Sequence, residues 1–345
     1  MESFKLSHDE KWTRANSLFS EVKARSDIAL LGVLARETSL SPTNADKTPA
    51  AIRVAMSRYS TYSASRKVDL RDLSFTDLGD VSAPDHIEGE ARVALAVANT
   101  LATHQLLIAL GGDNSITYSV AAGMWPDLSK IGLITLDAHH DLRDGVSNGS
   151  PVWRLIQSGL VGKNIVQVGI SDFANSREYS ERAQEHGVHV ITRDVLRKRP
   201  MDDVMAEALE IAGAGGREIY VDLDVDVCDR SVTPACPASI PGGISSDELR
   251  QAAFLSGHTE YFGKENFQTK SKPKYEEITI VNRSNKNKFE EYLKIHQKGE
   301  TDYFTFCKHC AETGIEKWRV NLDKMTCTYY DKAKNEILVE IVPIV

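Results

Sequence analysis

Residues 131–144 read IGLITLDAHHDLRD, and this stretch decides the fold. The apolar run before Asp137, His139 and Asp141 predicts a buried strand, because strand side chains alternate between two faces with a period of two. Extended backbone beyond the strand sends these three side chains to one side. Two carboxylates and an imidazole, with no lysine between them, suit a divalent metal ion. A solvated acidic turn is the alternative, since Asp is common after strands.

A second acidic stretch lies at residues 220–229, which read YVDLDVDVCD. Strand alternation places Asp222, Asp224 and Asp226 on one face and apolar residues on the other. Three stacked carboxylates repel one another unless a cation neutralises them. An edge strand with a wet acidic face is the alternative, but the apolar opposite face favours a covered sheet. The two stretches together predict a metal site.

Strand and helix patterns alternate along the first 250 residues. Strands are expected at residues 27–32, 131–136, 187–191 and 218–225, together with a short buried strand at 105–110 and a strand that ends at Ile170. Helices are expected after Pro49 and at residues 87–104 and 202–212. This alternation predicts an α/β fold, a three-layer parallel sheet with helices on both faces. Sites in such sheets form beyond the carboxyl ends of the strands, where both acidic stretches fall.

Composition limits the possible classes of protein. The chain has 345 residues, of which 41% are hydrophobic, so it can form a sizeable core and two domains. The N-terminus MESFKLSHDEKW is too charged for a signal peptide, and no apolar run reaches transmembrane length. Five scattered cysteines fit a reducing compartment. We expect a cytoplasmic protein without a membrane partner, and the net charge of -8 gives no reason to expect nucleic acid binding.

Basic-residue usage divides the chain into two parts. Residues 1–256 contain 18 Arg and 8 Lys, whereas residues 257–345 contain 2 Arg and 13 Lys. Folding gives no reason for such a change. We therefore predict two domains of different origin, 1–256 and 257–345, joined near Gly257.

Three motifs resemble the arginase/agmatinase/formimidoylglutamase family of binuclear manganese hydrolases over about residues 25–256. They are GGDNS at 111–115, DAHHD at 137–141 and the stretch from Asp224 to Gly243. The resemblance implies two Mn²⁺ per chain, held by Asn114, Asp137, His139, Asp141, Asp224 and Asp226. It makes Asp137 and Asp224 bridging ligands, with Asn114 and Asp141 at one ion and His139 and Asp226 at the other. The family typically has His in place of Asn114, and a neutral amide is the weaker ligand, so we expect one weakened position.

The substrate class follows from further resemblance. The runs DLR at 141–143, SNGSP at 147–151 and FANS at 173–176 are similar to formimidoylglutamase members, whereas arginases and agmatinases have His near Asn148. This implies hydrolysis of formimidoylglutamate, a small amidine, to glutamate and formamide. Arg143 is a candidate carboxylate clamp or a surface salt-bridge partner of Asp144 or Asp141. Asn148 and Asn175 are candidate substrate-binding residues, although Asn175 also suits a cap or turn. Asp141 is the candidate proton relay.

Two alternatives stay open. The first is an agmatinase or other guanidine hydrolase, and the second is an inactive fusion protein that retains metal binding. Family members are commonly trimers or hexamers, so the resemblance also implies a homo-oligomer.

The family continues into one more central strand and a closing helix, which are missing after residues 246–256. Their loss leaves backbone groups unpaired and apolar faces uncovered. The tail from about residue 261 resembles the C-terminal part of a small bacterial family of uncharacterised function. It predicts helices at 286–298 and 303–313, followed by a hairpin of 317–322 or 326–330 with 336–342. The tail is therefore expected to be a small α+β segment.

Overall fold

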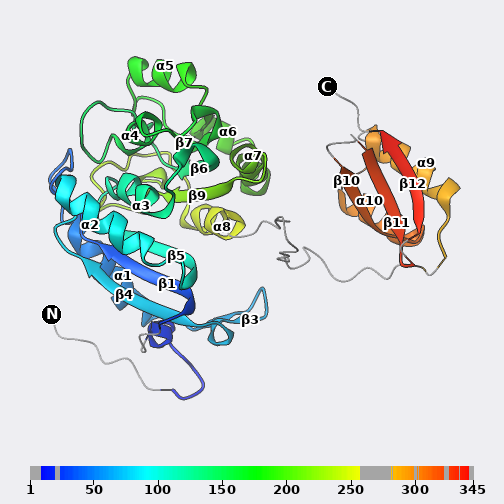
Figure 1. Cartoon of the computed structure of the whole chain (residues 1–345), viewed down its shortest axis with the longest axis horizontal. Coiled ribbons are helices and arrows are strands. Elements are labelled where there is room, and N and C mark those ends of the chain that lie inside the picture. Colours follow the sequence, from blue (N-terminus) through cyan, green and yellow to red (C-terminus); the bar gives the residue numbers. More distant parts are fainter. Residues whose placement is uncertain are drawn as a thin grey trace. The chain divides into compact units, whose positions relative to one another are not determined.

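The computed structural model describes residues 9–19, 24–256, 281, 283–298, 301, 303–321, 326–333 and 335–341. The chain forms two compact units, Met1–Thr269 and Lys270–Val345 (Figure 1). The junction predicted near Gly257 lies outside the described residues, so the boundary after residue 256 stays a prediction.

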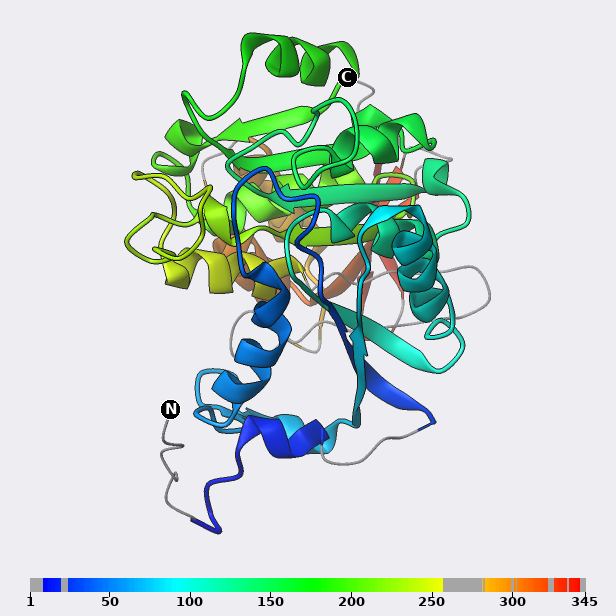
Figure 2. The ribbon, with the colours of Figure 1, turned by 90° about the vertical axis from the view of Figure 1, so that its left-hand side faces the viewer.

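The first unit contains two parallel sheets, which Figure 2 shows one above the other. The three-stranded sheet has the order β4 (Phe75–Val81), β1 (Ser26–Val33), β5 (His104–Gly111). The four-stranded sheet has the order β8 (His189–Thr192), β7 (Ile165–Ile170), β6 (Ile131–Leu136), β9 (Glu218–Leu223). All pairs are parallel, as the alternating pattern predicted. A short antiparallel pair, β2 (Tyr62–Ser63) and β3 (Val68–Asp69), lies outside both.

Helices cover both faces of the four-stranded sheet. Along β6, Leu133 packs with Leu155 on one face, whereas Ile134 packs with Val204 on the other. This alternation gives the three layers that the sequence predicted. The helices of this unit are α1 (Thr48–Met56), α2 (His86–Ala98), α3 (Ile116–Met124), α4 (Pro151–Gln157), α5 (Arg177–Glu185), α6 (Arg193–Leu196), α7 (Met201–Gly213) and α8 (Ser246–Ser256).

A gap separates the two sheets. Among the described residues, β5 pairs only with β1 and β9 only with β6, and both strands line one cavity of ≈ 1860 Å³. The expectation of a buried strand at 105–110 is therefore wrong, because Leu106 is 53% and Ile108 40% exposed on this edge. Parallel sheets normally have neighbours on both sides of such strands. The gap agrees with the predicted loss of a central strand.

The acidic stretch at 220–229 does not form one continuous strand. β9 ends at Leu223, and Asp224 is the N-cap of a 3-10 turn, Val225–Val227. The Asp224 side chain accepts a hydrogen bond from the backbone N of Asp226 at 2.9 Å. This Asx-type bond offers the backbone an alternative to the sheet ladder and ends the strand. The expectation that Asp222, Asp224 and Asp226 share one strand face is wrong.

The second unit is a small α+β domain, as expected. It contains α9 (Lys286–Gln297), α10 (Tyr303–Glu312) and an antiparallel sheet of β10 (Ile315–Asn321), β11 (Thr326–Asp331) and β12 (Glu336–Ile341). Phe289, Phe306 and Tyr329 belong to its core. The strand that pairs with β12 is β11, and β10 pairs with the other edge of β11. The predicted strand ends at Leu322 and Val342 lie outside the described residues.

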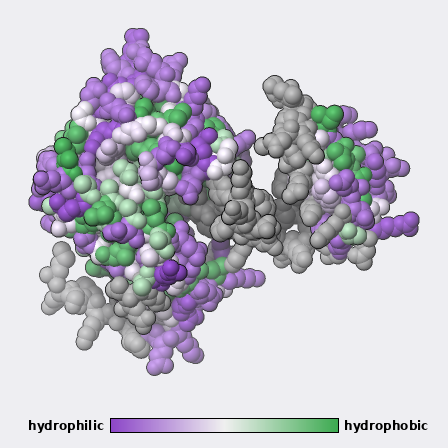
Figure 3. Space-filling view, in the orientation of Figure 1, coloured by the Kyte–Doolittle hydropathy of each residue, from purple (hydrophilic) through white to green (hydrophobic). Residues whose placement is uncertain are grey.

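Hydrophobic and hydrophilic side chains both reach the surface of the first unit (Figure 3). Ile87 and Leu95 on α2 are among the most exposed apolar residues. Scattered exposure of this kind is ordinary for a protein surface. Within the described part of the chain, no helix combines the length and apolar character that crossing a membrane requires.

Candidate metal centre

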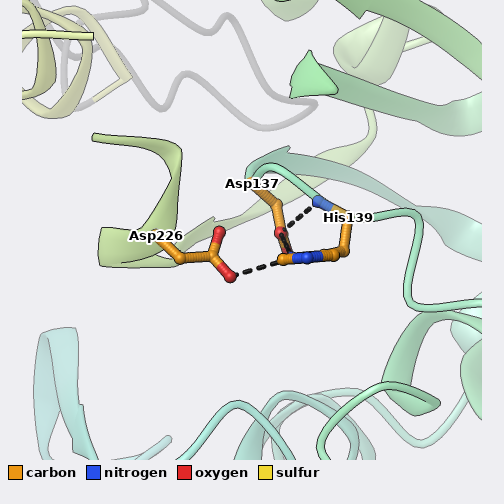
Figure 4. Close-up of side chains that lie close together, drawn as sticks. All are labelled: Asp137, His139 and Asp226. Carbon is orange, nitrogen blue, oxygen red and sulfur yellow. Dashed lines mark hydrogen bonds and ion pairs between the residues drawn. The ribbon is translucent and has the colours of Figure 1, made fainter. Parts of the chain in front are cut away.

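Asp137, His139 and Asp226 form a compact cluster at the carboxyl end of the four-stranded sheet (Figure 4). One potential ligand atom from each residue lies within 4.8 Å of the others. His139 Nδ1 lies 2.9 Å from Asp226 Oδ2 and 3.4 Å from Asp137 Oδ1. Both aspartates are buried. Two carboxylates and one imidazole are ligands that Mn²⁺ and similar divalent ions accept.

Two loops build this cluster and hold each other. Asp137 is the first residue after β6, and its backbone N donates to the carbonyl of Val168 in β7 at 3.0 Å. Asp226 lies in the 3-10 turn after β9, and its Oδ1 accepts from the backbone N of Ala138 at 3.0 Å. The two acidic stretches therefore meet because β6 and β9 are neighbours whose carboxyl ends share one edge of the sheet.

The electrostatics of the cluster favour a bound cation. Burial, with repulsion from Asp226, raises the pKa of Asp137 to about 7. Burial also raises the pKa of Asp141 and Asp224 well above the usual carboxyl value, with added repulsion from neighbouring carboxylates. Burial lowers the pKa of His139, but its bonds to Asp137 and Asp226 outweigh burial and raise it to about 10. Protons thus compensate a buried negative charge that a divalent ion can neutralise instead, so these residues fit a metal.

Asn114 and Asp141 lie beside the cluster. The Nδ2 of Asn114 donates to Asp141 Oδ2 and lies 3.4 Å from Asp137 Oδ2. Its Oδ1 accepts from the hydroxyl of Thr117 at 3.0 Å. The amide nitrogen therefore faces the carboxylates, and coordination of a metal by Oδ1 requires the amide to turn over. The GGDNS turn needs glycine, since a Cβ on Gly112 would lie 2.0 Å from the carbonyl oxygen of Ala35.

The predicted substrate residues Arg143, Asn148 and Asn175 all line the cavity that His139 and Asp226 of the cluster also line. The Arg143 guanidinium lies 6.0 Å from the ring centre of Tyr179. Asp144, the partner that the surface alternative proposed for it, instead pairs with Arg182 at 2.9 Å. Arg143 is therefore exposed at the cavity with its donors available to a carboxylate.

The side chains of both asparagines form hydrogen bonds with the backbone of neighbouring loops. Asn148 Oδ1 accepts from the backbone N of Leu40 at 2.9 Å. Asn175 Oδ1 accepts from the backbone N of His140 at 2.8 Å, and its Nδ2 donates to the carbonyl of Ala138 at 3.0 Å. Asn175 thus fastens the DAHHD loop to the loop after β7 and is neither the cap of α5, which is Ser176, nor an isolated turn former. Substrate binding by either residue stays a prediction.

A family model for the arginase family matches residues 26–259. This match covers most of the first unit and includes every residue of the cluster. The chain belongs to the arginase family. A second model, for a protein of unknown function (DUF1398), matches residues 251–341, which agrees with the predicted resemblance of the tail.

Relatives of this arginase-family chain include the formimidoylglutamase of Halalkalibacterium halodurans. It is 36% identical over 260 residues, which are 72% of this chain and 82% of the relative. The crystal structure of formimidoylglutamase from Bacillus subtilis superposes with a TM-score of 0.68 at 31% identity, covering 73% of this chain and 82% of that one. An N114H variant of Trypanosoma cruzi formiminoglutamase, solved with Mn²⁺, gives a TM-score of 0.66 at 25% identity, covering 72% and 87%.

Two buried polar residues of the site, Gln167 and Arg193, were not predicted from the sequence. The Oε1 of Gln167 in β7 accepts a hydrogen bond from His140 Nδ1 at 2.7 Å, and its Nε2 donates to the His140 carbonyl at 2.8 Å. It thereby fixes the centre of the DAHHD loop. The signal was a lone amide in the apolar strand IVQVGI. Arg193, the second, follows β8 directly, at the same edge of the sheet as the acidic motifs.

Metal affinity is expected to rise with pH. The imidazole of His139, with a pKa of about 10, and the carboxyl of Asp137, with a pKa of about 7, must lose their protons to coordinate a metal. For each proton that the metal displaces, the affinity for the metal rises about tenfold per pH unit below the pKa of the group that loses the proton. Titration with Mn²⁺ from pH 6 to 8.5 measures this, and calorimetry in buffers of different ionisation enthalpy counts the protons. An affinity that is constant over this range would contradict the assignment.

Proposed function

We propose that this chain is a manganese-dependent hydrolase that converts formimidoylglutamate to glutamate and formamide. Family, relatives and fold indicate a hydrolase acting on C–N bonds of amidines. The single observation that supports the proposal most is the cluster of Asp137, His139 and Asp226, of which His139 and Asp226 line a cavity that Arg143 also lines. This arrangement combines a cation site with a carboxylate-binding cation.

The ligands divide into two sets. Asp137, His139 and Asp226 are positioned to hold one Mn²⁺ together. Asn114, Asp141 and Asp224 are proposed to hold a second ion with Asp137, with the Asn114 amide turned so that its oxygen faces the ion. When bound, the metal lowers the pKa of a water molecule into the physiological range and so supplies a nucleophile.

A residue of the chain then supplies the proton that the leaving nitrogen needs. Hydrolysis forms a C–O bond at the amidine carbon and breaks the C–N bond to glutamate, so the departing nitrogen must gain a proton. We assign this transfer to a carboxylate oxygen of Asp141, which is buried and lines the cavity. On the α3 side, the Thr117 hydroxyl donates to Asp222 Oδ2 at 3.0 Å and so orients that carboxylate.

Substrate selection is assigned to Arg143. Formimidoylglutamate has two carboxylates, and the planar guanidinium binds a carboxylate in bidentate fashion. The amidine end is cationic and suits the acidic end of the cavity. Asn148 has no ionisable proton to exchange, so this chain lacks a histidine proton shuttle at that position.

The test compares N-formimidoyl-L-glutamate with agmatine on protein loaded with Mn²⁺. We expect turnover of the first, and an Arg143→Met variant with KM raised at least about tenfold, since one charge-assisted bidentate contact is lost. Arg177→Met on α5, whose Arg is exposed and paired with Glu181, is the matched control and leaves KM unchanged. Faster turnover of agmatine would instead assign a guanidine hydrolase.

Metal binding with turnover of neither substrate would identify an inactive fusion protein. The gap between β5 and β9 gives that outcome a physical basis, because it leaves one side of the site without a strand.

A further inference from the structure

Arg193 is a buried cation that contacts the backbone of the cluster residue Asp226, and no step above uses it. It is the first residue of α6 and only 5% exposed. Its Nη2 donates to the carbonyl of Asp226 at 2.8 Å and to the carbonyl of Val227 at 3.2 Å. Its Nε and Nη1 are buried and have no hydrogen-bond partner among the described residues.

This arrangement costs stability. A buried guanidinium with unpaired donors loses its hydration without full compensation, and burial accordingly lowers the pKa of Arg193. Replacing a whole buried ion pair by apolar residues is often neutral or stabilising, so buried charges are weak evidence for a role in stability. A buried charge with unpaired donors is expected at a functional site, where a residue has a role even though it lowers the stability of the fold.

The contacts of Arg193 point to the site. Asp226 is held at three places: its Oδ1 by the backbone N of Ala138, its Oδ2 by His139, and its backbone carbonyl by Arg193. The two carbonyls bound by Arg193 belong to the 3-10 turn that orients the Asp226 carboxylate. Asp226, Asp137 and Asp229 also attract the guanidinium charge.

We propose that Arg193 is a positioning residue that fixes the turn at Asp226 and so sets the affinity of the metal site formed by Asp137, His139 and Asp226. The inference rests on the proposed metal centre. Arg193 does not coordinate the ion. It acts through the backbone of a ligand, in the way that partners of metal ligands elsewhere orient the groups that bind the metal.

The test separates a positioning role from a role in folding. In Arg193→Met, the dissociation constant for Mn²⁺ rises about 10- to 100-fold. The melting temperature of the metal-free Met variant falls, because two backbone carbonyls lose their donor and the nearby carboxylates lose a cation. The affinities are therefore compared at a temperature at which every variant is folded. Arg193→Lys, which keeps a charge and a donor, binds Mn²⁺ within about threefold of the parent protein. Arg197→Met, the same change one turn later at an exposed position, leaves the affinity unchanged.

Two results would overturn the inference. One is an Arg193→Met variant that binds Mn²⁺ with the parent affinity, and the other is an Arg193→Lys variant that loses as much affinity as the Met variant. If the Met variant does not fold, Arg193→Gln is measured against the same thresholds. A parent protein that binds no Mn²⁺ removes the proposed function itself, whereas parent binding with an unaltered Met variant removes only the role of Arg193.

Discussion

Replacing Asp137 with asparagine is expected to abolish tight Mn²⁺ binding and to lower amidine turnover by more than about a hundredfold, beyond the loss seen for partners of metal ligands. Asp137 is 1% exposed, and its Oδ1 accepts from the backbone N of His139 at 2.6 Å while facing the His139 ring. An amide preserves this shape but removes the charge that attracts the ion. Elemental analysis and turnover on the same sample measure both effects.

Asp172→Asn is the control for this substitution. Asp172 is exposed in the loop after β7 and takes no part in the cluster, so its variant keeps the parent metal content and activity. If the Asp137→Asn variant retains its metal, the ion lies elsewhere in the chain. A fall in melting temperature is not expected, since the variant removes repulsion between buried carboxylates.

Replacing Asn114 with histidine is expected to tighten Mn²⁺ binding at the second position by about tenfold or more, because imidazole is a stronger ligand than a neutral amide. The Asn114 side chain already reaches both Asp137 and Asp141, so a ring nitrogen at this place can face the same carboxylates. Calorimetric titration then shows two tight sites, where the parent shows one tight and one weak.

Asn148→His is the matched control, because it makes the same change in the wall of the same cavity at a side chain that bonds to the backbone of Leu40 and is not among the proposed ligands. It leaves Mn²⁺ affinity unchanged. If the Asn114→His variant binds Mn²⁺ no better than the parent, Asn114 is not at a metal position, and the second set of ligands must be reassigned.

Local patterns predicted much of this structure. The run before Asp137 is strand β6, buried on both faces, and the alternation of strands and helices gave the parallel α/β class. The rule that sites form at the carboxyl ends of parallel strands brought together two acidic stretches separated by more than eighty residues. The period of two predicted that β9 continues past Leu223. Instead, the Asp224 side chain accepts a hydrogen bond from a backbone N–H there, and β9 ends. A period of two cannot distinguish a strand from such a turn.

Long-range polar contacts could not be predicted. Arg193 and Gln167 hold the metal loops through bonds to backbone groups of residues 33 and 27 positions away. Only the folded arrangement shows which loop each side chain reaches. The predicted loss of a central strand implied uncovered apolar faces, but the sequence of β5 did not say that β5 borders the gap. Homo-oligomer formation and cytoplasmic location stay predictions.

The most direct test of the account is the metal content of the purified full-length chain after reconstitution with Mn²⁺ and removal of loosely bound ions. We predict at least one Mn²⁺ per chain, rising toward two with excess metal, and loss of the tightly bound ion in the Asp137→Asn and Asp226→Asn variants. A parent chain that retains no Mn²⁺, or the same content in parent and variants, would contradict the metal centre formed by Asp137, His139 and Asp226.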